Sequence, residues 1–419
     1  MNRLLQNFLT TFIVRGDLTI RSASGAMFRC GDGRGPRVKV AFRDAAAEMR
    51  LLRDPTLAFG ELYMDEGIAI EEGTLVEALE LALANLDPAH ASTWIRTLDR
   101  LRFALRRRRQ RNDTRRSREN VAHHYDLGNS LYELFLDADM QYSCAYFEHP
   151  GQALDDAQIA KKRHIAAKLL VRPHHEVLDI GCGWGGMAIY LASICGAQAT
   201  GVTLSTEQLE RARARAAASA TGGRAGFRLE DYRNTQGAFD RIVSVGMLEH
   251  VGAPNLDAYF AQVANLLKRE GAALIHTIGR PEGPGVTNPW IAKYIFPGGY
   301  IPALSELAPA IERSGLLIAD IEVLRLHYAD TLKAWRERFL ARRAEAAAMY
   351  DDRFCRMWEF YLAACEAGFR LGQQVVYQFL LVHQLDALPI TRDYIALEEA
   401  RLRGVEAEGW RPRGRLAGE

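Results

Sequence analysis

The architecture of this chain follows from the segment His175-Glu-Val-Leu-Asp-Ile-Gly-Cys-Gly-Trp-Gly-Gly186. A short apolar run ends in Asp179 and continues directly into a turn with glycines at 181, 183, 185 and 186. Glycines let the backbone turn sharply and approach a ligand closely. The apolar-periodic segment from Met187 to Ala192 then begins a helix. A strand, a glycine turn and a helix in this order predict a site for a nucleotide-type cofactor.

Two kinds of cofactor fit such a turn. Gly181, Gly183 and Gly186 satisfy the dinucleotide pattern G-x-G-x-x-G. A dinucleotide fold also requires an acidic residue at the end of the second strand, but that strand ends Gly201-Val-Thr-Leu-Ser205 without a carboxylate. The acid instead precedes the first glycine, which resembles the class I methyltransferases that bind S-adenosylmethionine. A tight turn in some other α/β protein is the remaining alternative.

Length and composition limit the number of domains and the kinds of metal site and membrane segment that the chain can contain. A chain of 419 residues with 48% hydrophobic content predicts about two to three domains or one enlarged domain. Its six cysteines show no C-x-x-C pair and no zinc-ligand spacing, so we expect free thiols, a reducing cytosol and no metal site. No apolar run approaches the roughly 20 residues that cross a bilayer, and polar residues within 4–14 argue against a secretory signal.

The pattern predicts four regions. Residues 1–95 form a small α+β domain, 96–119 an arginine-rich linker, 120–400 the catalytic domain, and 401–419 a polar tail. The segment 59–67 is interpreted as turn and packing. The net charge of +1 is uninformative, but the linker is strongly basic. It is either merely solvated or binds nucleic acid or anionic lipid, where each basic residue contributes about 1 kcal/mol.

Strands and helices alternate through the catalytic region. The strands are expected at 176–180, 198–203, 225–229, 240–245, 272–277, 317–323 and 375–382, and the helices at 156–170, 206–218, 256–267 and 305–314. This order predicts an α/β fold with a doubly wound, mostly parallel sheet, whose ligands lie beyond the carboxyl ends of the strands. Insertions at 279–302 and 328–372 are expected to form a helical subdomain that covers the substrate.

Several polar residues follow the predicted strands. Glu249 and His250 follow the strand at 240–245, His276 ends the strand at 272–277, and Asp231 follows the strand at 225–229. A single histidine at a strand end is more often structural than catalytic. Together these residues predict a pocket with an acid, a base and a cofactor beside the glycine turn.

At this point the chain resembles the cyclopropane-fatty-acyl-phospholipid synthases, a family similar to the mycolic acid cyclopropane synthases. The resemblance covers about 120–390 and rests on the blocks His124-Tyr-Asp-Leu-Gly-Asn129, Met140-Gln-Tyr-Ser-Cys-Ala-Tyr-Phe147, 177–186, 201–208, 240–252, 276–279, Lys293-Tyr-Ile-Phe-Pro-Gly-Gly299, 327–328 and Arg353-Phe-Cys-Arg-Met-Trp358. The amino-terminal domain resembles only the longer, bacterial members that act on phospholipids. Leu248 departs from the phenylalanine usual before the Glu-His pair.

The resemblance implies the chemistry. A methyl group moves from the sulfonium of S-adenosylmethionine to a cis double bond of a phospholipid acyl chain, and a base removes a proton from that methyl so that the ring closes. The implied base is a bound bicarbonate. Its implied ligands are Cys144, Glu249, His276 and Tyr328, with a backbone donor at Ile278. Without the resemblance, Cys144 would be interpreted as a packing thiol.

The resemblance also implies the cofactor contacts, which are Tyr142, Ser143, Asp179, Gly181, Gly183, Thr203, Leu204, Gln208, Asp231 and Tyr232. Gln208 would replace the missing carboxylate at the ribose, and Asp231 would meet the adenine amino group. The expected partners are unsaturated phospholipid and an anionic bilayer surface, with the enzyme cytoplasmic and peripheral at the inner face of the cell membrane. A homodimer is a family-level expectation.

Three other functions stay open at this stage. A related lipid C-methyltransferase would deliver the same methyl but give a methyl-branched or methylene product. A catalytically idle protein could keep the fold and bind lipid or nucleic acid. A nucleic-acid methyltransferase is disfavoured, because Glu249-His250 stands where such enzymes carry a polar-Pro-Pro-aromatic motif. We therefore expect no nucleic acid partner.

Overall fold

The computed structural model describes residues 2–86, 97, 101–104, 110 and 128–408. The chain forms two compact units. The first contains residues 1–109, 286–297 and 332–374, and the second contains residues 110–285, 298–331 and 375–419. Most of the predicted arginine-rich linker, and most of the His124 block, lie outside the described residues.

The second unit is built on a seven-stranded sheet in the order β10-β11-β9-β8-β5-β6-β7. Its strands are β5 (Glu176–Ile180), β6 (Gln198–Thr203), β7 (Ala225–Leu229), β8 (Phe239–Val245), β9 (Leu267–Gly279), β10 (Leu317–Leu324) and β11 (Val375–Val382). Strands β5 to β9 pair in parallel, and β11 runs antiparallel to both β9 and β10. The doubly wound, mostly parallel α/β fold expected from the sequence is therefore confirmed.

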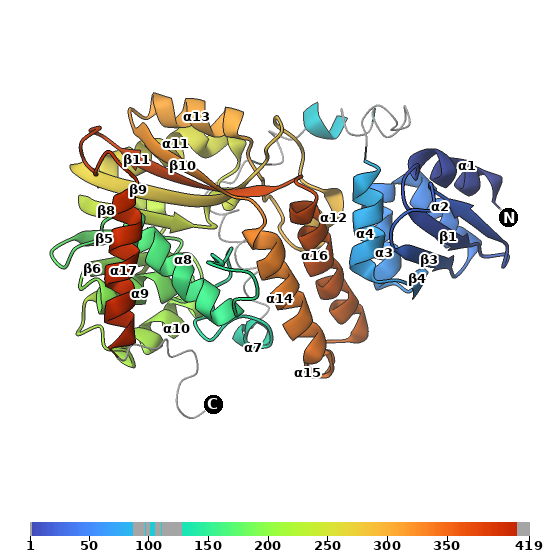
Figure 1. The fold of residues 1–419 in the computed structure, drawn as a ribbon, viewed down its shortest axis with the longest axis horizontal. Helices are drawn as coiled ribbons and strands as arrows, with labels where there is room; N and C mark the ends of the chain where they lie inside the picture. The colour runs from blue at the N-terminus through green and yellow to red at the C-terminus, as the bar shows by residue number, and fades with distance from the viewer. Residues whose placement is uncertain (1, 87–96, 98–100, 105–109, 111–127, 409–419) are drawn as a thin grey trace. The chain divides into compact units, whose positions relative to one another are not determined.

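Helices cover both faces of this sheet (Figure 1). The described helical elements of this unit are α7 (Asn129–Glu133), α8 (Leu154–Lys168), α9 (Gly186–Ile194), α10 (Thr206–Ala217), η1 (Tyr232–Asn234), η2 (Leu248–His250), η3 (Ala253–Asn255), α11 (Leu256–Leu266), α13 (Leu304–Arg313), α17 (Asp393–Ala407) and the start of α14 (His327–Ala341). The helices expected at 156–170, 206–218, 256–267 and 305–314 are found within about two residues of their predicted bounds.

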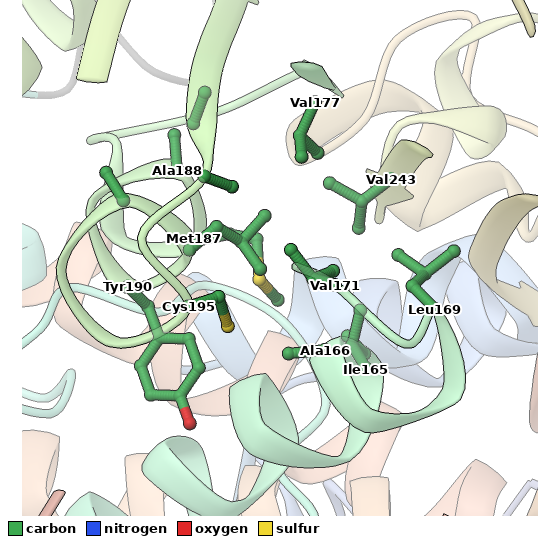
Figure 2. Packing of buried hydrophobic residues seen from close by; sticks show 14 of the residues in the cluster. Ile165, Ala166, Leu169, Val171, Val177, Met187, Ala188, Tyr190, Cys195 and Val243 are labelled. Atoms are coloured by element: carbon green, nitrogen blue, oxygen red, sulfur yellow. The ribbon is translucent and has the colours of Figure 1, made fainter. Parts of the chain in front are cut away.

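Alternation along the strands explains the two helical layers. In β5, Val177 packs with the residues of α8, α9 and α17, whereas its neighbour Leu178 packs with those of α11 and α13. Figure 2 shows part of the first layer, in which Leu169, just after α8, lies near Val243 of the sheet, and Ile165 of α8 belongs to the same cluster. Successive strand residues point to opposite faces, so both faces of these strands must be apolar.

The first unit has its own core. Its four-stranded sheet has the order β2-β1-β3-β4, formed by β1 (Asp17–Arg21), β2 (Met27–Cys30), β3 (Arg37–Phe42) and β4 (Ile68–Glu72). Its helices are α1 (Arg3–Phe12), α2 (Ala45–Arg53), α3 (Pro55–Met64), α4 (Leu75–Ala84), α12 (Pro289–Tyr294), the later part of α14, α15 (Arg343–Met349) and α16 (Asp352–Arg370).

The two predicted insertions therefore share a compact unit with the amino-terminal residues, and 120–400 is not one continuous body. The ring of Trp290 lies 4.6 Å from that of Phe360, and Phe360 also contacts Phe59 of α3 at 5.8 Å. A Cβ on Gly60 would lie 2.5 Å from the Trp290 indole nitrogen, so only glycine permits this packing. The segment 59–67 lies mostly in α3, in agreement with its interpretation as packing.

Helix α17 crosses the carboxyl-terminal boundary that was expected at residue 400. Helix α17 continues to Ala407, through the first residues of the segment expected to be a polar tail. Leu402 is fully buried, and Glu406 accepts a hydrogen bond of 2.6 Å from the Tyr190 hydroxyl and pairs with Arg163. Tertiary packing thus extends a helix whose sequence appears polar. Among the described residues, no helix combines the length and the apolar composition needed to span a bilayer.

Candidate active site

A pocket lies at the carboxyl ends of β5, β6, β7 and β8, where a doubly wound sheet places its ligands. All ten residues expected to contact the cofactor line it: Tyr142, Ser143, Asp179, Gly181, Gly183, Thr203, Leu204, Gln208, Asp231 and Tyr232. They come from the segment before α8, from the ends of β5 and β6, and from the residues that follow β5, β6 and β7, including the first turn of α10. The structure thus brings together residues that lie 90 positions apart in the sequence, from 142 to 232.

The glycine turn forms one wall of this pocket. Gly181, Gly183 and Gly185 have φ of 79°, 53° and 83°, in the left-handed region that favours glycine. A Cβ on Gly181 would lie 2.7 Å from Cγ of Met247, whereas a Cβ on Gly183 would meet no atom within 4 Å. Gly183 therefore leaves an open approach to the backbone that none of the described residues fills. This is where a ligand can come close to the chain.

Asp179 is the buried acid of the pocket. Its side chain is 2% exposed, and its Oδ2 accepts no hydrogen bond from the part of the chain that the structure describes. Burial raises the pKa of this carboxyl to about 7, although the positive charge of Lys161 opposes the shift. An unsatisfied buried carboxylate is costly, and a cationic ligand group would relieve that cost. Asp179 therefore fits the ammonium of an amino-acid ligand.

The other end of the pocket is polar. The Thr203 hydroxyl donates to Oε1 of Gln208 at 2.9 Å, which leaves the amide nitrogen of Gln208 as the donor for a ligand hydroxyl. Asp231 is 2% exposed and forms an ion pair with Arg233 at 2.6 Å. Burial raises the pKa of the adjacent Tyr232 to about 12, so its phenol stays protonated. These groups suit a ribose and an adenine.

Sequence reasoning missed the buried support behind the pocket. Lys161 of α8 is fully buried, and its ammonium donates to Oε1 of Gln141 at 2.8 Å and to Oγ of Ser143 at 2.7 Å. Burial lowers the pKa of Lys161 to about 8. Lys162, one residue further, pairs with Asp139 at 2.5 Å. The available signal was the polar run Lys161-Lys162-Arg163-His164 inside a helix next to the sheet.

Glu249 and Ile278, two of the residues expected to hold the anion, are in direct contact. The Ile278 N–H donates to Oε1 of Glu249 at 2.6 Å, so Glu249 uses the backbone donor that the resemblance assigned to the anion. Oε2 of Glu249 is buried without a hydrogen-bond partner in the described structure. Burial raises the pKa of Glu249 to about 7, against the effect of the Ile278 N–H. The carboxyl is thus suited to exchange a proton near neutral pH.

His276 is buried in β9, two residues before Ile278. Its Nδ1 lies 3.1 Å from the amide nitrogen of Gln378. Burial, followed by the charges of Lys161 and Lys168, lowers the pKa of this imidazole. His276 is therefore neutral near pH 7, and it can donate a hydrogen bond from one nitrogen only.

Cys144 and Tyr328 are joined through α14. The N–H of Ala145 donates to the Thr331 hydroxyl at 3.0 Å, one helical turn after Tyr328. Cys144 is fully buried, and burial raises the pKa of its thiol, so it is a neutral hydrogen-bonding group and not a nucleophile. The five residues expected to hold the anion do not line the cofactor pocket themselves, but Cys144 and Glu249 directly adjoin Ser143 and His250, which do. In the described regions, no three His, Cys, Asp or Glu side chains form a metal-binding cluster.

His250 was considered from the sequence but was not included among the expected cofactor contacts. It lines the pocket, and burial lowers its pKa to about 4, so it is a neutral wall residue. Trp184, Met247 and Asn255 also line the pocket and were not expected. Trp184 could have been found, since it lies inside the glycine segment.

The strand order, the glycine turn and the buried acid define a methyltransferase of the S-adenosylmethionine-dependent class, a fold shared with coclaurine N-methyltransferase at a TM-score of 0.53 and 20% identity. Within this class, the family described as mycolic acid cyclopropane synthetase matches residues 112–379, and the chain belongs to that family.

Its relatives agree with this assignment. The chain is 42% identical to the cyclopropane-fatty-acyl-phospholipid synthase of Escherichia coli over 77% of this chain and 81% of the relative. It is 37% identical to tuberculostearic acid methyltransferase UfaA1 of Mycobacterium tuberculosis over 91% of both chains. The solved cyclopropane synthase MmaA2 of Mycobacterium tuberculosis aligns with a TM-score of 0.60 and 32% identity, over 63% of this chain and 97% of that one.

Proposed function

We propose that this enzyme adds a methylene group from S-adenosylmethionine across the cis double bond of an unsaturated phospholipid acyl chain and so forms a cyclopropane fatty acid. The observation that carries the proposal is the buried Glu249 carboxyl with its unpartnered Oε2, next in sequence to a residue of the methyltransferase pocket. Simple methyl transfer to a good nucleophile needs no buried base of this kind. Addition to an alkene does, because a carbon-bound proton must leave before the ring closes.

The cofactor fits the pocket that the ten expected residues help to line. S-adenosylmethionine, when bound, supplies an electrophilic methyl group. Asp179 would hold its ammonium, the open backbone at Gly183 would receive its amino-acid end, and Gln208 would donate to its ribose. The solved mycolic acid cyclopropane synthase CmaA1, 32% identical to this chain, has been described with the demethylated cofactor, SAH, and the cationic detergent CTAB. That ligand pair supports a donor pocket next to a site for an alkyl chain.

The second step removes a proton from the transferred methyl, as the three-membered ring closes on the carbocation left by alkene attack. A bicarbonate would be held by the Cys144 thiol, the His276 imidazole and the Tyr328 phenol, and it would supply a small base at a buried position. Glu249 would hold the proton-bearing oxygen or receive the proton, since its pKa lies near 7. For the anion to use the Ile278 N–H, Glu249 would have to share or release it.

A methyl-branched or methylene product is the second candidate, and one observation favours it. The relative that matches over 91% of both chains is a tuberculostearic acid methyltransferase, whereas the Escherichia coli cyclopropane synthase matches over 77% of this chain. Both outcomes share the first carbon–carbon bond. They differ in whether the proton leaves with ring closure or with formation of a new double bond.

The product test uses purified enzyme, methyl-labelled S-adenosylmethionine and vesicles of cis-unsaturated phospholipid, with mass spectrometry before and after catalytic hydrogenation. A ring gives a product that gains one methylene and takes up no hydrogen. A methylene product has the same mass but takes up hydrogen, and that result would overturn ring formation. A saturated methyl branch would be heavier by two hydrogens and would require an added reductant.

We also propose that the enzyme works at the surface of an anionic bilayer on the cytoplasmic side. Support comes from the basic segment 96–119, with Arg106, Arg107, Arg108 and Arg109 in succession. Co-sedimentation with vesicles that contain anionic lipid should exceed that with zwitterionic vesicles and should fall as salt rises. Equal binding to both would contradict the proposal. Sedimentation velocity of the full chain tests the proposed homodimer.

A further inference from the structure

A row of polar side chains crosses three neighbouring strands on one face of the sheet, in an otherwise apolar layer. His276 of β9 pairs in register with Gln378 of β11, and Gln378 pairs in register with Glu322 of β10. Gln378 is 1% exposed, in a strand of sequence Val-Val-Tyr-Gln-Phe-Leu-Leu-Val whose eight residues are all buried. A buried amide is destabilising unless its oxygen and nitrogen both form hydrogen bonds, so the partners of the Gln378 amide must supply those bonds.

Helix α8 supplies one of these partners. The ammonium of Lys168 donates to Oε1 of Gln378 at 2.8 Å and also pairs with Glu322. A lysine ammonium is only a donor, so the group that faces Lys168 must be the carbonyl oxygen of the amide. This fixes the orientation of Gln378. Its NH₂ group, which is also only a donor, is then the group that lies 3.1 Å from Nδ1 of His276.

The amide orientation decides the protonation of His276. Because the Gln378 NH₂ can only donate, Nδ1 of His276 must accept and carries no proton. In a neutral imidazole the proton is then on Nε2. We infer that Gln378, oriented by Lys168, is a positioning residue that holds His276 as the neutral Nε2–H tautomer. His276 can therefore donate to a bound anion through Nε2 and cannot itself accept a proton there.

A second row of contacts holds Lys168 in place. One helical turn before it, His164 contacts Glu322 through Nε2 at 2.7 Å and Glu399 through Nδ1 at 2.6 Å. Each ring nitrogen of His164 faces one carboxylate, which can only accept, so both nitrogens must carry a proton. His164 is therefore a charged imidazolium, in contrast to the neutral His276. Lys168 and His164 thus meet Glu322 and Glu399 as two cations and two anions. This balanced cluster keeps the charged Lys168 of α8 in contact with Gln378 on the face of the sheet.

The catalytic role of His276 rests on the proposed function. Its tautomer does not, because it can be measured in the enzyme without turnover. The test is nitrogen NMR of the full-length enzyme labelled with ¹⁵N-histidine, with the signal assigned by its loss in His276→Gln. We expect Nδ1 of the acceptor type and Nε2 of the protonated type between about pH 6 and pH 8. A protonated Nδ1 in the wild-type enzyme would overturn the inference.

Substitutions of Gln378 then test the cause. Gln378→Glu replaces the donor by an acceptor, so the proton should move to Nδ1 or the imidazole should become charged, and turnover should fall at least about tenfold with cofactor affinity unchanged. Phe379→Leu, on the opposite face of β11, controls for loss of sheet packing and should leave the His276 signals in place. An unchanged tautomer in Gln378→Glu would refute the role of Gln378. If His276→Gln retains full turnover while the tautomer is as described, the proposed function of His276 fails and the positioning stands.

Discussion

The cofactor pocket and the Glu249–His276 region differ in how the chain builds them. The ten expected cofactor contacts of the pocket lie in short segments, at the ends of β5, β6 and β7 and in the stretch before α8. The Glu249–His276 region is made by side chains within or beside buried strands and by helix α14, held through Ile278, Gln378 and Thr331. Cofactor binding should therefore tolerate changes in the second region, whereas proton transfer should depend on its buried partners.

Glu249→Gln should produce the largest difference between the effect on turnover and the effect on cofactor binding. The amide keeps the size of the side chain but cannot accept a proton, so turnover should fall about 10² to 10⁴-fold. Cofactor affinity, measured by calorimetry, should stay within about twofold, because Glu249 does not line the pocket. A variant with normal turnover would remove Glu249 from the mechanism. Glu312→Gln, on the surface at the end of α13, is the matched control.

Asp179→Asn should have the opposite pattern of effects, with weaker cofactor binding and nearly normal turnover at saturating cofactor. The change removes the buried carboxylate whose unpartnered Oδ2 is expected to hold the cofactor ammonium, so cofactor affinity should fall about 10 to 100-fold, or roughly 1.5–3 kcal/mol. Saturating cofactor should restore most of the turnover. Asp257→Asn, whose partner is the exposed Arg313, should leave affinity unchanged. Equal cofactor affinity in Asp179→Asn would show that this acid does not contact the ligand.

Gly183→Ala, compared with Gly223→Ala, distinguishes a steric effect on cofactor binding from the cost of backbone strain. Gly183 and Gly223 both have positive φ, and a Cβ on either would meet no atom within 4 Å. Alanine should therefore destabilise the fold similarly at both positions, by about 1 kcal/mol. Only Gly183→Ala should also weaken cofactor binding, by about tenfold, because its Cβ would meet the ligand. Thermal melts and binding titrations of both variants check this, and equal affinities would place the cofactor away from Gly183.

The smallest effect concerns the charged cluster behind the sheet. Burial opposes a charge on His164, but hydrogen bonds to Glu322 and Glu399 raise its pKa above the usual value. A raised folded-state pKa means that this stabilisation is complete below about pH 6.5 and is lost as pH rises through the folded pKa.

The stability advantage of wild type over His164→Gln should therefore be about 1 to 3 kcal/mol at low pH and shrink as pH rises. Denaturant unfolding at several pH values measures this difference. Both proteins contain His175 and His250, whose pKa values are lowered to about 4 mainly by burial. The pH dependence contributed by these two histidines therefore cancels in the stability difference, which reports on His164 alone. An advantage that grows with pH would contradict a charged His164.

Local sequence patterns predicted the sheet and the glycine turn well, because both depend on short-range rules, whereas the other expected cofactor contacts came from the family resemblance. The seven predicted strands of the sheet unit are all present, and the turn after β5 places Gly181 and Gly183 at the pocket, as their spacing from Asp179 implied. Three features required contacts between distant residues. They are the shared unit of residues 1–109 with two later insertions, the extension of α17 beyond residue 401, and the polar row through Gln378.

Periodicity and turn chemistry act over a few residues, so the order of strands and helices and the glycine turn could be predicted from the chain alone, and the family resemblance supplied the expected cofactor contacts. The charge states of the ionisable groups depend on packing and could not be predicted in this way. Asp179 and Glu249 have pKa values near 7 because they are buried, and Lys168 orients Gln378 because α8 crosses the same face of the sheet. Burial and the pairing of distant charges arise from packing, which no local pattern of residues specifies.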